Sequence, residues 1–223
     1  MATDLVIFDC DGVLIDSEII SAKMLVAELA RLGVTIDLDY VARHFLGRSY
    51  PTVMQQIREE FGLNLPEAFE EQYRNRLLAA FERDLTIMPG IAEVIGALAV
   101  PYCIATSSSP RRARRSLEIV AFPGLEETPL FTASMVEHGK PAPDLFLLAA
   151  EKMGVKPRDC LVIEDSLNGI RAAHAAGMEV LRFTGGTHLQ GRDLTPPDDA
   201  RPAKTFDSFA RFFQIVPQLR RAP

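Results

Sequence analysis

Residues 5–14, LVIFDCDGVL, carry an apolar run directly into two aspartates and a glycine. The run at 5–8 is too short for a helix, and its unbroken apolar character is typical of a strand buried on both faces. Asp9 and Asp11 come directly after it. Burying carboxylates at such a strand end costs free energy unless a cation or hydrogen-bond donors compensate them. The stretch therefore predicts a central strand with a polar site at its carboxyl end.

Similar short apolar runs recur along the chain and alternate with helical patterns. We expect further strands at residues 102–105, 130–133, 161–163 and 180–183, and helices at 90–99, 110–119, 143–153 and 167–176. This alternation predicts an α/β fold, a Rossmann-like doubly wound parallel sheet covered by helices on both faces. Right-handed crossovers then bring the carboxyl ends of all strands to one edge.

Residues 16–86 interrupt the alternation, because their patterns are helical at 17–32, 38–45, 50–61 and 66–82. We therefore predict a helical cap domain at 16–86, inserted into a core domain made of 1–15 and 87–223. Residues 185–203 are rich in Gly, Pro and Asp and are expected to form a loop. The amphipathic stretch at 206–216 is expected to dock on the sheet.

Composition and charge exclude several classes of function. The net charge of −6 over 223 residues disfavours nucleic-acid binding, which needs a basic face. No apolar run is long enough for a membrane span, and the start of the chain lacks the basic region of a signal peptide. The sparse cysteines, Cys10, Cys103 and Cys160, are expected to be reduced, buried thiols, which favours a cytoplasmic protein. A monomer is the default expectation.

Polar residues gather at the predicted carboxyl edge of the sheet. They follow three strands and open one helix: Asp9, Asp11, Thr106, Ser107, Ser108, Lys140, Glu164 and Asp165. Four carboxylates at one edge would repel each other unless a cation lay among them. Oxygen ligands select a hard ion, Mg²⁺ before Zn²⁺. None of the four histidines, His44, His138, His174 and His188, is expected at a strand end with metal-like spacing.

A dense group of arginines follows the serine run at 107–109. Ser109 and Pro110 are a typical helix start, so Arg111, Arg112, Arg114 and Arg115 fall on one helix. We interpret the group mainly as a solvated helix face. Arg111 alone is expected to lie near enough to the strand end to contact a substrate.

The polar residues match four motifs of a known family in order and spacing. They are DCDGV at 9–13, Thr106 in ATSSS, Lys140 in KPAPD, and EDS at 164–166. On these motifs the chain resembles the haloacid dehalogenase superfamily of phosphotransferases over essentially its whole length. The start DGVLIDSE and the inserted helices resemble its β-phosphoglucomutase-like group, which includes 6-phosphogluconate phosphatases.

The resemblance implies a Mg²⁺-dependent phosphatase that hydrolyses a small phosphorylated metabolite, such as a sugar phosphate. Asp9 would attack phosphorus and form an aspartyl-phosphate, and Asp11 would act as general acid and base. The family pattern assigns Mg²⁺ to Asp9, the Asp11 backbone carbonyl and Asp165, with Glu164 as a ligand or a partner of the ligands. Substrate contacts are expected from Thr106, Ser107, Ser108, Lys140, Arg48 and Glu18, with Arg43 and Arg74 as further candidates in the cap.

The alternatives are a sugar phosphomutase, a dehalogenase, a phosphonatase and a non-catalytic binding protein. Mutases of this group carry a histidine where Ser21 stands here and an arginine near Tyr50, which favours hydrolysis. Dehalogenases lack the second aspartate, and phosphonatases need a cap lysine, for which only Lys23 is present. A non-catalytic descendant would have lost at least one motif residue.

Overall fold

Six parallel strands form a single sheet in the computed structural model, which describes residues 3–65 and 69–222. The strand order is β3-β2-β1-β4-β5-β6. The strands are β1 (Leu5–Phe8), β2 (Tyr102–Thr106), β3 (Leu130–Thr132), β4 (Cys160–Glu164), β5 (Glu179–Phe183) and β6 (Lys204–Phe206). The predicted doubly wound α/β fold is confirmed. Only β6 was not predicted, because its first two residues are exposed at the sheet edge and carry no apolar pattern.

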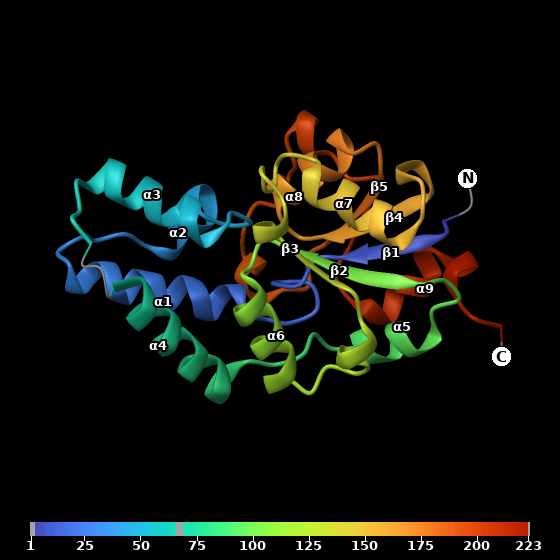
Figure 1. Cartoon of the computed structure of the whole chain (residues 1–223), viewed down its shortest axis with the longest axis horizontal. Coiled ribbons are helices and arrows are strands. Elements are labelled where there is room, and N and C mark those ends of the chain that lie inside the picture. Colours follow the sequence, from blue (N-terminus) through green and yellow to red (C-terminus); the bar gives the residue numbers. More distant parts are fainter. Residues whose placement is uncertain (1–2, 66–68, 223) are drawn as a thin grey trace.

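Helices cover both faces of this sheet (Figure 1). One face packs against α5 (Ile91–Ala97), α6 (Pro110–Ile119) and α9 (Phe212–Ile215), and the other against α7 (Asp144–Met153) and α8 (Leu167–Ala175). The side chains of β1 alternate between the two cores: Val6 and Phe8 face the first layer, and Leu5 and Ile7 face the second. All four are fully buried, which explains why the strand is apolar throughout.

The C-terminal amphipathic stretch docks on the first of these layers, as predicted. Phe206, Phe209 and Phe212 are buried in the same apolar cluster as Phe183 of β5. Little of the stretch is α-helix, since α9 has only four residues.

A separate cluster of helices lies beside the sheet, at the left of Figure 1. Its members are α1 (Glu18–Arg31), α2 (Leu38–His44), α3 (Tyr50–Phe61) and α4 (Phe69–Asp84). They enclose an apolar core of their own, which includes Leu29, Met54, Ile57 and Phe81. The expected start of the fourth helix at residues 66–68 lies outside the described residues. We call α1–α4 the cap; the exact domain boundaries at 15/16 and 86/87 stay a prediction.

Two antiparallel chain segments connect the cap to the sheet. The Asp16 amide donates to the Thr86 carbonyl at 3.0 Å, and the Met88 amide donates to the Leu14 carbonyl at 2.8 Å. The first segment leaves directly from the DCDG loop. The cap is therefore joined to the chain only a few residues from Asp9 and Asp11.

Within the described residues, no helix has the length and apolar character to cross a membrane. Cys10, Cys103 and Cys160 are free thiols and buried, as expected. Burial raises the pKa of the Cys10 thiol well above its ordinary value, with the neighbouring aspartates adding to the effect. Cys10 is therefore held as an unreactive thiol.

Candidate active site

The ends of three adjacent strands bring the motif residues together. Because β1 lies between β2 and β4, Asp9, Thr106 and Glu164 meet at one edge of the sheet. The Asp9 amide donates to the Ile163 carbonyl at 2.9 Å, which extends the pairing of β1 with β4 into the loop. Lys140, from the segment before α7, reaches the same place. The edge convergence expected from the sequence is what the fold produces.

Lys140 joins two of the acidic residues. Its Nζ lies 2.6 Å from Asp9 Oδ1 and 2.8 Å from Glu164 Oε1, and it donates to the Ala105 carbonyl at 3.0 Å. Burial alone would lower the pKa of Lys140, but the two carboxylates outweigh burial and raise it above the ordinary value. The side chain is therefore a fixed buried ammonium that faces Asp9.

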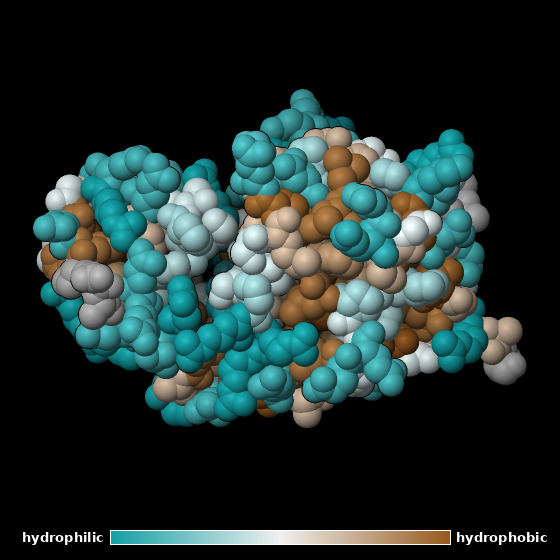
Figure 2. Space-filling model, viewed as in Figure 1, coloured by the Kyte–Doolittle hydropathy of each residue, from teal (hydrophilic) through white to brown (hydrophobic). Residues whose placement is uncertain are grey.

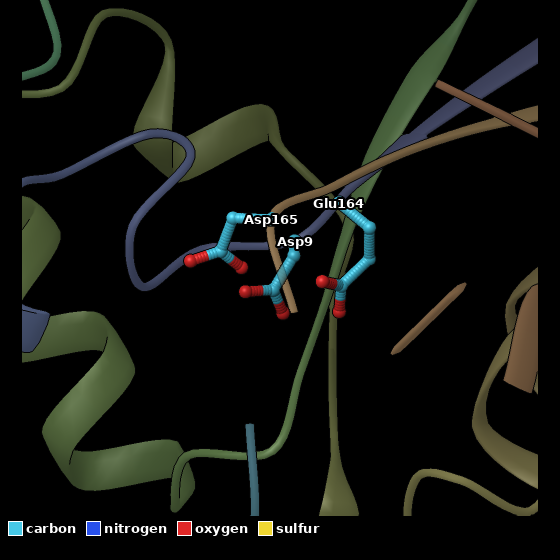
Figure 3. A group of neighbouring side chains, drawn as sticks. All are labelled: Asp9, Glu164 and Asp165. Atoms are coloured by element: carbon cyan, nitrogen blue, oxygen red, sulfur yellow. The ribbon is translucent and has the colours of Figure 1, made fainter. Parts of the chain in front are cut away.

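Three acidic side chains surround this edge, and their carboxylates converge on one space (Figure 3). One oxygen each of Asp9, Glu164 and Asp165 lies within 4.8 Å of the others, and all three residues are buried. Burial raises the pKa of Asp9 and of Asp165 well above their ordinary values, and the neighbouring carboxylates add to both shifts. One ammonium does not balance this charge, so the cluster suits a divalent cation with oxygen ligands.

The oxygens of the cluster are not equally free. Glu164 accepts from Lys140 through Oε1 and from the Ser166 amide through Oε2 at 2.7 Å. Asp165 Oδ2, in contrast, is buried and forms no hydrogen bond with the described residues. A cation at this edge would therefore find open oxygens on Asp9 and Asp165, with Glu164 holding Lys140.

Asp11 lies beside the cluster and is surrounded by donors instead of carboxylates. Its Oδ1 accepts from Ser17 Oγ at 2.5 Å, and its Oδ2 accepts from Ser108 Oγ at 2.6 Å and Thr106 Oγ1 at 3.4 Å. Burial alone would raise the pKa of Asp11, but Arg112 and the two serine hydroxyls outweigh it and lower the pKa. The two motif aspartates thus differ in environment, which suits different chemical roles.

The arginine group on α6 is not solvated throughout, because Arg112 faces the site. Its Nη2 lies 2.8 Å from Asp11 Oδ1 and 3.2 Å from Ser21 Oγ in the cap, and its guanidinium lies over the Phe81 ring. Arg111, which was expected to approach the substrate, is exposed with Arg114 and Arg115 on the outer side of α6. The interpretation of Arg112 as solvated was wrong, because Arg112 shares a helix face with buried Ala113 and Ser116.

The cap closes over the catalytic edge. Ser107 Oγ donates to the Gly47 carbonyl at 3.3 Å, and Asn168 Nδ2 donates to the Leu46 carbonyl at 3.2 Å. The remaining cavity is about 30 Å³, and the cap residues Glu18, Arg48 and Tyr50 line it together with the motif residues. Ligand pockets usually measure about 300–1,000 Å³, so this space alone is too small for a whole substrate in the closed arrangement.

Two larger spaces flank this cavity. One, of about 230 Å³, lies between α3, α4 and the serine run, and its lining includes Tyr50, Tyr73, Arg74 and Arg112. The other, of about 710 Å³, lies on the α8 side, where Arg43 and Arg48 face the core. In Figure 2 the surface is hollowed where the cap meets the sheet part. Of the expected cap contacts, Glu18 and Arg48 reach the catalytic cavity, Arg74 reaches the first flanking space, and Arg43 reaches only the second.

His188 was excluded from the site by the sequence reasoning, and the structure brings it there. Its Nε2 lies 2.9 Å from Asp165 Oδ2, and the ring is buried. Burial lowers the pKa of His188 below its ordinary value, against the opposing effects of Glu18 and Asp16. The GGTH stretch at 185–188 follows β5 at the same sheet edge. Its position after a predicted strand was the feature of the sequence that could have indicated His188 as a site residue.

Comparisons with known proteins agree with this geometry. The family model of haloacid dehalogenase-like hydrolases matches residues 3–177. The chain is 28% identical to a 6-phosphogluconate phosphatase of Escherichia coli over 82% of this chain and 83% of that protein. It is 33% identical to a probable pseudouridine-5'-phosphatase of Drosophila melanogaster over 78% of this chain and 79% of that protein.

A solved structure shares the whole architecture. A conserved haloacid dehalogenase-like protein of unknown function from Agrobacterium tumefaciens matches with a TM-score of 0.78 and 31% identity. The match covers 97% of this chain and 99% of that one. The sheet and the cap therefore follow one shared architecture.

Proposed function

The chain belongs to the family of haloacid dehalogenase-like hydrolases, and we propose that within it the protein is a Mg²⁺-dependent phosphatase that works through an aspartyl-phosphate. It is an enzyme that hydrolyses phosphomonoesters. One observation carries the mechanistic proposal: the Asp9 carboxylate contacts the buried ammonium of Lys140 and lies within 4.8 Å of a second carboxylate, Asp165.

Asp9 is the nucleophile in this proposal. Lys140 holds its Oδ1 at 2.6 Å, which leaves Oδ2 for attack on phosphorus. The hydroxyls of Thr106 and Ser108 and the Ser107 side chain line the same cavity and would donate to the phosphoryl oxygens. Phosphoryl transfer needs mainly positioning and charge stabilisation, and these residues supply both.

Asp11 is the general acid and base. Its four donors hold the carboxylate in the wall of the cavity, and one of them, Arg112, also lines the neighbouring 230 Å³ space. It would protonate the leaving oxygen in the first step and take a proton from water in the second. Its lowered pKa favours the ionised carboxylate, which the second role needs.

The residues fit a magnesium ion at the acidic edge. Asp9, Asp165 and the Asp11 backbone carbonyl would hold it, and Glu164 would orient Lys140. The bound ion would offset carboxylate charge and stabilise negative charge on the transferring group.

The leaving group would occupy the 230 Å³ space next to the cavity. Its lining combines the rings of Tyr50 and Tyr73 with the cations Arg74 and Arg112. Two buried donors there, Tyr50 Oη and Arg112 Nε, have no partner among the described residues. These features support a small organic phosphate with oxygen acceptors, such as a sugar phosphate or sugar-acid phosphate, in line with the substrates that the names of the relatives give.

Hydrolysis is favoured over mutase chemistry because the described partners of the Asp11 carboxylate, Ser17, Thr106, Ser108 and Arg112, include no cap histidine. Ser21, at the mutase histidine's position, donates to the Ser17 carbonyl at 2.9 Å and accepts from Arg112. A serine held in this way offers no second acid or base for returning a phosphoryl group to a sugar.

The test is hydrolysis of p-nitrophenyl phosphate and acetyl phosphate with and without Mg²⁺, followed by a ranked kcat/KM screen. The screen would include 6-phosphogluconate, glucose 6-phosphate, 2-deoxyglucose 6-phosphate and β-glucose 1-phosphate. We expect release of phosphate that depends on Mg²⁺. Conversion of one sugar phosphate into its isomer without release of phosphate would overturn the proposal, as would inactivity of folded protein on the whole panel.

A further inference from the structure

His188 lies against Asp165 Oδ2, a cluster oxygen that forms no hydrogen bond with the described residues. Its Nε2 lies 2.9 Å from Asp165 Oδ2, and both atoms are buried. The ring stands in the 3₁₀ turn Thr187–Leu189, immediately after β5. A buried imidazole against a carboxylate oxygen can fix which way the second oxygen of that carboxylate points.

Glycines on both sides make room for this ring. A Cβ at Gly186 would lie 2.6 Å from His188 Cε1 and 2.7 Å from Nδ1. A Cβ at Gly12 would lie 2.9 Å from the same Cε1 and would collide with Asp165 Oδ2. Gly186 has φ −65°, where any residue fits, so its lack of a side chain serves the ring and not the backbone.

The segment that carries His188 is also tied to the cap. The Thr187 amide and Oγ1 both donate to Asp16 Oδ1, at 3.1 and 3.0 Å, where the chain passes into the cap. Arg192 Nε donates to the His188 carbonyl at 2.8 Å, and Arg192 Nη1 lies 2.7 Å from Asp39 Oδ1 of α2. One short stretch of chain therefore contacts Asp165, the connection to the cap, and a cap helix.

We propose that His188 is a positioning residue that orients the Asp165 carboxylate toward the cation site. We further propose that Arg192 makes this orientation depend on the closed position of the cap. The inference rests on the proposed function, because the cation is the one that the phosphatase would use. By linkage, a cation held more tightly in the closed state also favours closure by the same factor. The cap would then close more completely over a loaded site than over an empty one.

The experiment measures Mn²⁺ binding to substrate-free protein by electron paramagnetic resonance. We expect His188→Ala to weaken binding by about 10-fold or more, the usual effect of losing a partner of a metal ligand. Gly186→Ala should weaken binding in the same way, because its Cβ displaces the ring. His188→Gln, which keeps a donor, should recover part of the affinity. Wild-type affinity in both His188→Ala and Gly186→Ala, in folded protein, would overturn the inference.

A double-mutant cycle tests the link to the cap. Arg192→Ala should weaken Mn²⁺ binding less than His188→Ala, and the two changes together should lose less than the sum of the two single losses. Arg171→Ala is the matched control. Arg171 lines the same 710 Å³ space as Arg192 but pairs with Asp199 of the core at 2.7 Å, so its loss should leave Mn²⁺ binding unchanged. Additive losses, or an equal loss in the control, would overturn the link to the cap.

Failure of this inference can be told apart from failure of the proposed function. Mn²⁺ binding is measured without any turnover of substrate. A protein whose Mn²⁺ affinity depends on His188 but that hydrolyses no phosphomonoester would therefore contradict only the proposed function. A wild-type protein that hydrolyses phosphomonoesters but binds no Mn²⁺ would contradict the inference.

Discussion

Arg112 Nη2 lies 2.8 Å from Asp11 Oδ1 and 3.2 Å from Ser21 Oγ, so one guanidinium joins a core helix, the second motif aspartate and the first cap helix. We expect Arg112→Ala to lower kcat/KM by about 10- to 100-fold, because a charged hydrogen bond to a buried carboxylate contributes about 1.5–3 kcal/mol. Steady-state kinetics with a sugar phosphate measures the effect.

Arg111→Ala is the control for that change. Arg111 lies on the same helix but is exposed and faces away from the site, so its loss should leave kcat/KM unchanged. Arg112→Lys should recover only part of the rate, because an ammonium lacks the planar fork that reaches Asp11 and Ser21 together. Equal losses in the two alanine variants would contradict the assignment of Arg112.

The crowded carboxylates predict how stability without metal depends on pH. Burial, with a contribution from Asp11, raises the pKa of Glu18 from 4.5 to about 8, and Asp9 and Asp165 shift in the same direction. A carboxyl whose pKa is raised on folding stabilises the fold while it is protonated. That stabilisation is lost as the pH rises through the folded pKa, so Tm of the metal-free protein should fall between about pH 4.5 and 8.

Mg²⁺ should oppose this loss, since it stabilises the ionised carboxylates. We expect the rise in Tm on adding Mg²⁺ to be larger at pH 8 than at pH 5, by about 2–4 °C for each kcal/mol of binding free energy. Glu18→Gln should flatten the metal-free slope without abolishing the response to Mg²⁺. A Tm of metal-free protein that rises steadily with pH over this range would contradict the account of the charges.

The sequence allowed the sheet, the helices and the motif residues to be predicted, because each rests on a local pattern or a family motif. Arg112 was missed because the helix carries four arginines close together, and the group was interpreted as a whole and not position by position. The buried spacing of Ala113, Ser116 and Leu117 was the usable signal. His188 was missed because a loop without periodicity gives no direction to its side chains.

The closure of the cap depends on a glycine that touches the core. Gly47 has φ +73°, and a Cβ there would lie 2.5 Å from Ser166 Oγ. Gly47→Ala should therefore hold the cap off the core and lower kcat/KM on every substrate. Gly62→Ala is the matched control, because Gly62 has φ +62° and nothing within 4 Å of its Cβ position.

Both glycine variants carry the same backbone strain, about 1 kcal/mol, so both should lower Tm, and Gly47→Ala adds the clash with Ser166. Only Gly47→Ala should lose activity. If Gly62→Ala loses as much activity as Gly47→Ala, the effect of Gly47 is one of stability and not of closure.

The leaving-group space predicts that loss of Arg74 affects large substrates and small substrates differently. Arg74→Ala should raise KM for 6-phosphogluconate or glucose 6-phosphate by about 10-fold, the loss expected for one charged contact. It should leave kcat/KM for acetyl phosphate unchanged, because acetyl phosphate is too small to fill the space lined by Tyr50, Tyr73 and Arg74. A uniform loss on both substrates would show that Arg74 acts through the fold and not through the leaving group.

The central claim is that Asp9 carries the phosphoryl group between the two steps, and rapid acid quench of Asp11→Asn with acetyl phosphate tests it most directly. Acetyl phosphate has a good leaving group, so the first step should survive the loss of the acid, while the second step loses its base. Mass spectrometry should then find a phosphoryl group on Asp9, and Asp9→Asn should form no adduct and have no turnover. A phosphoryl group on another residue, or near-normal turnover by Asp9→Asn, would contradict the account.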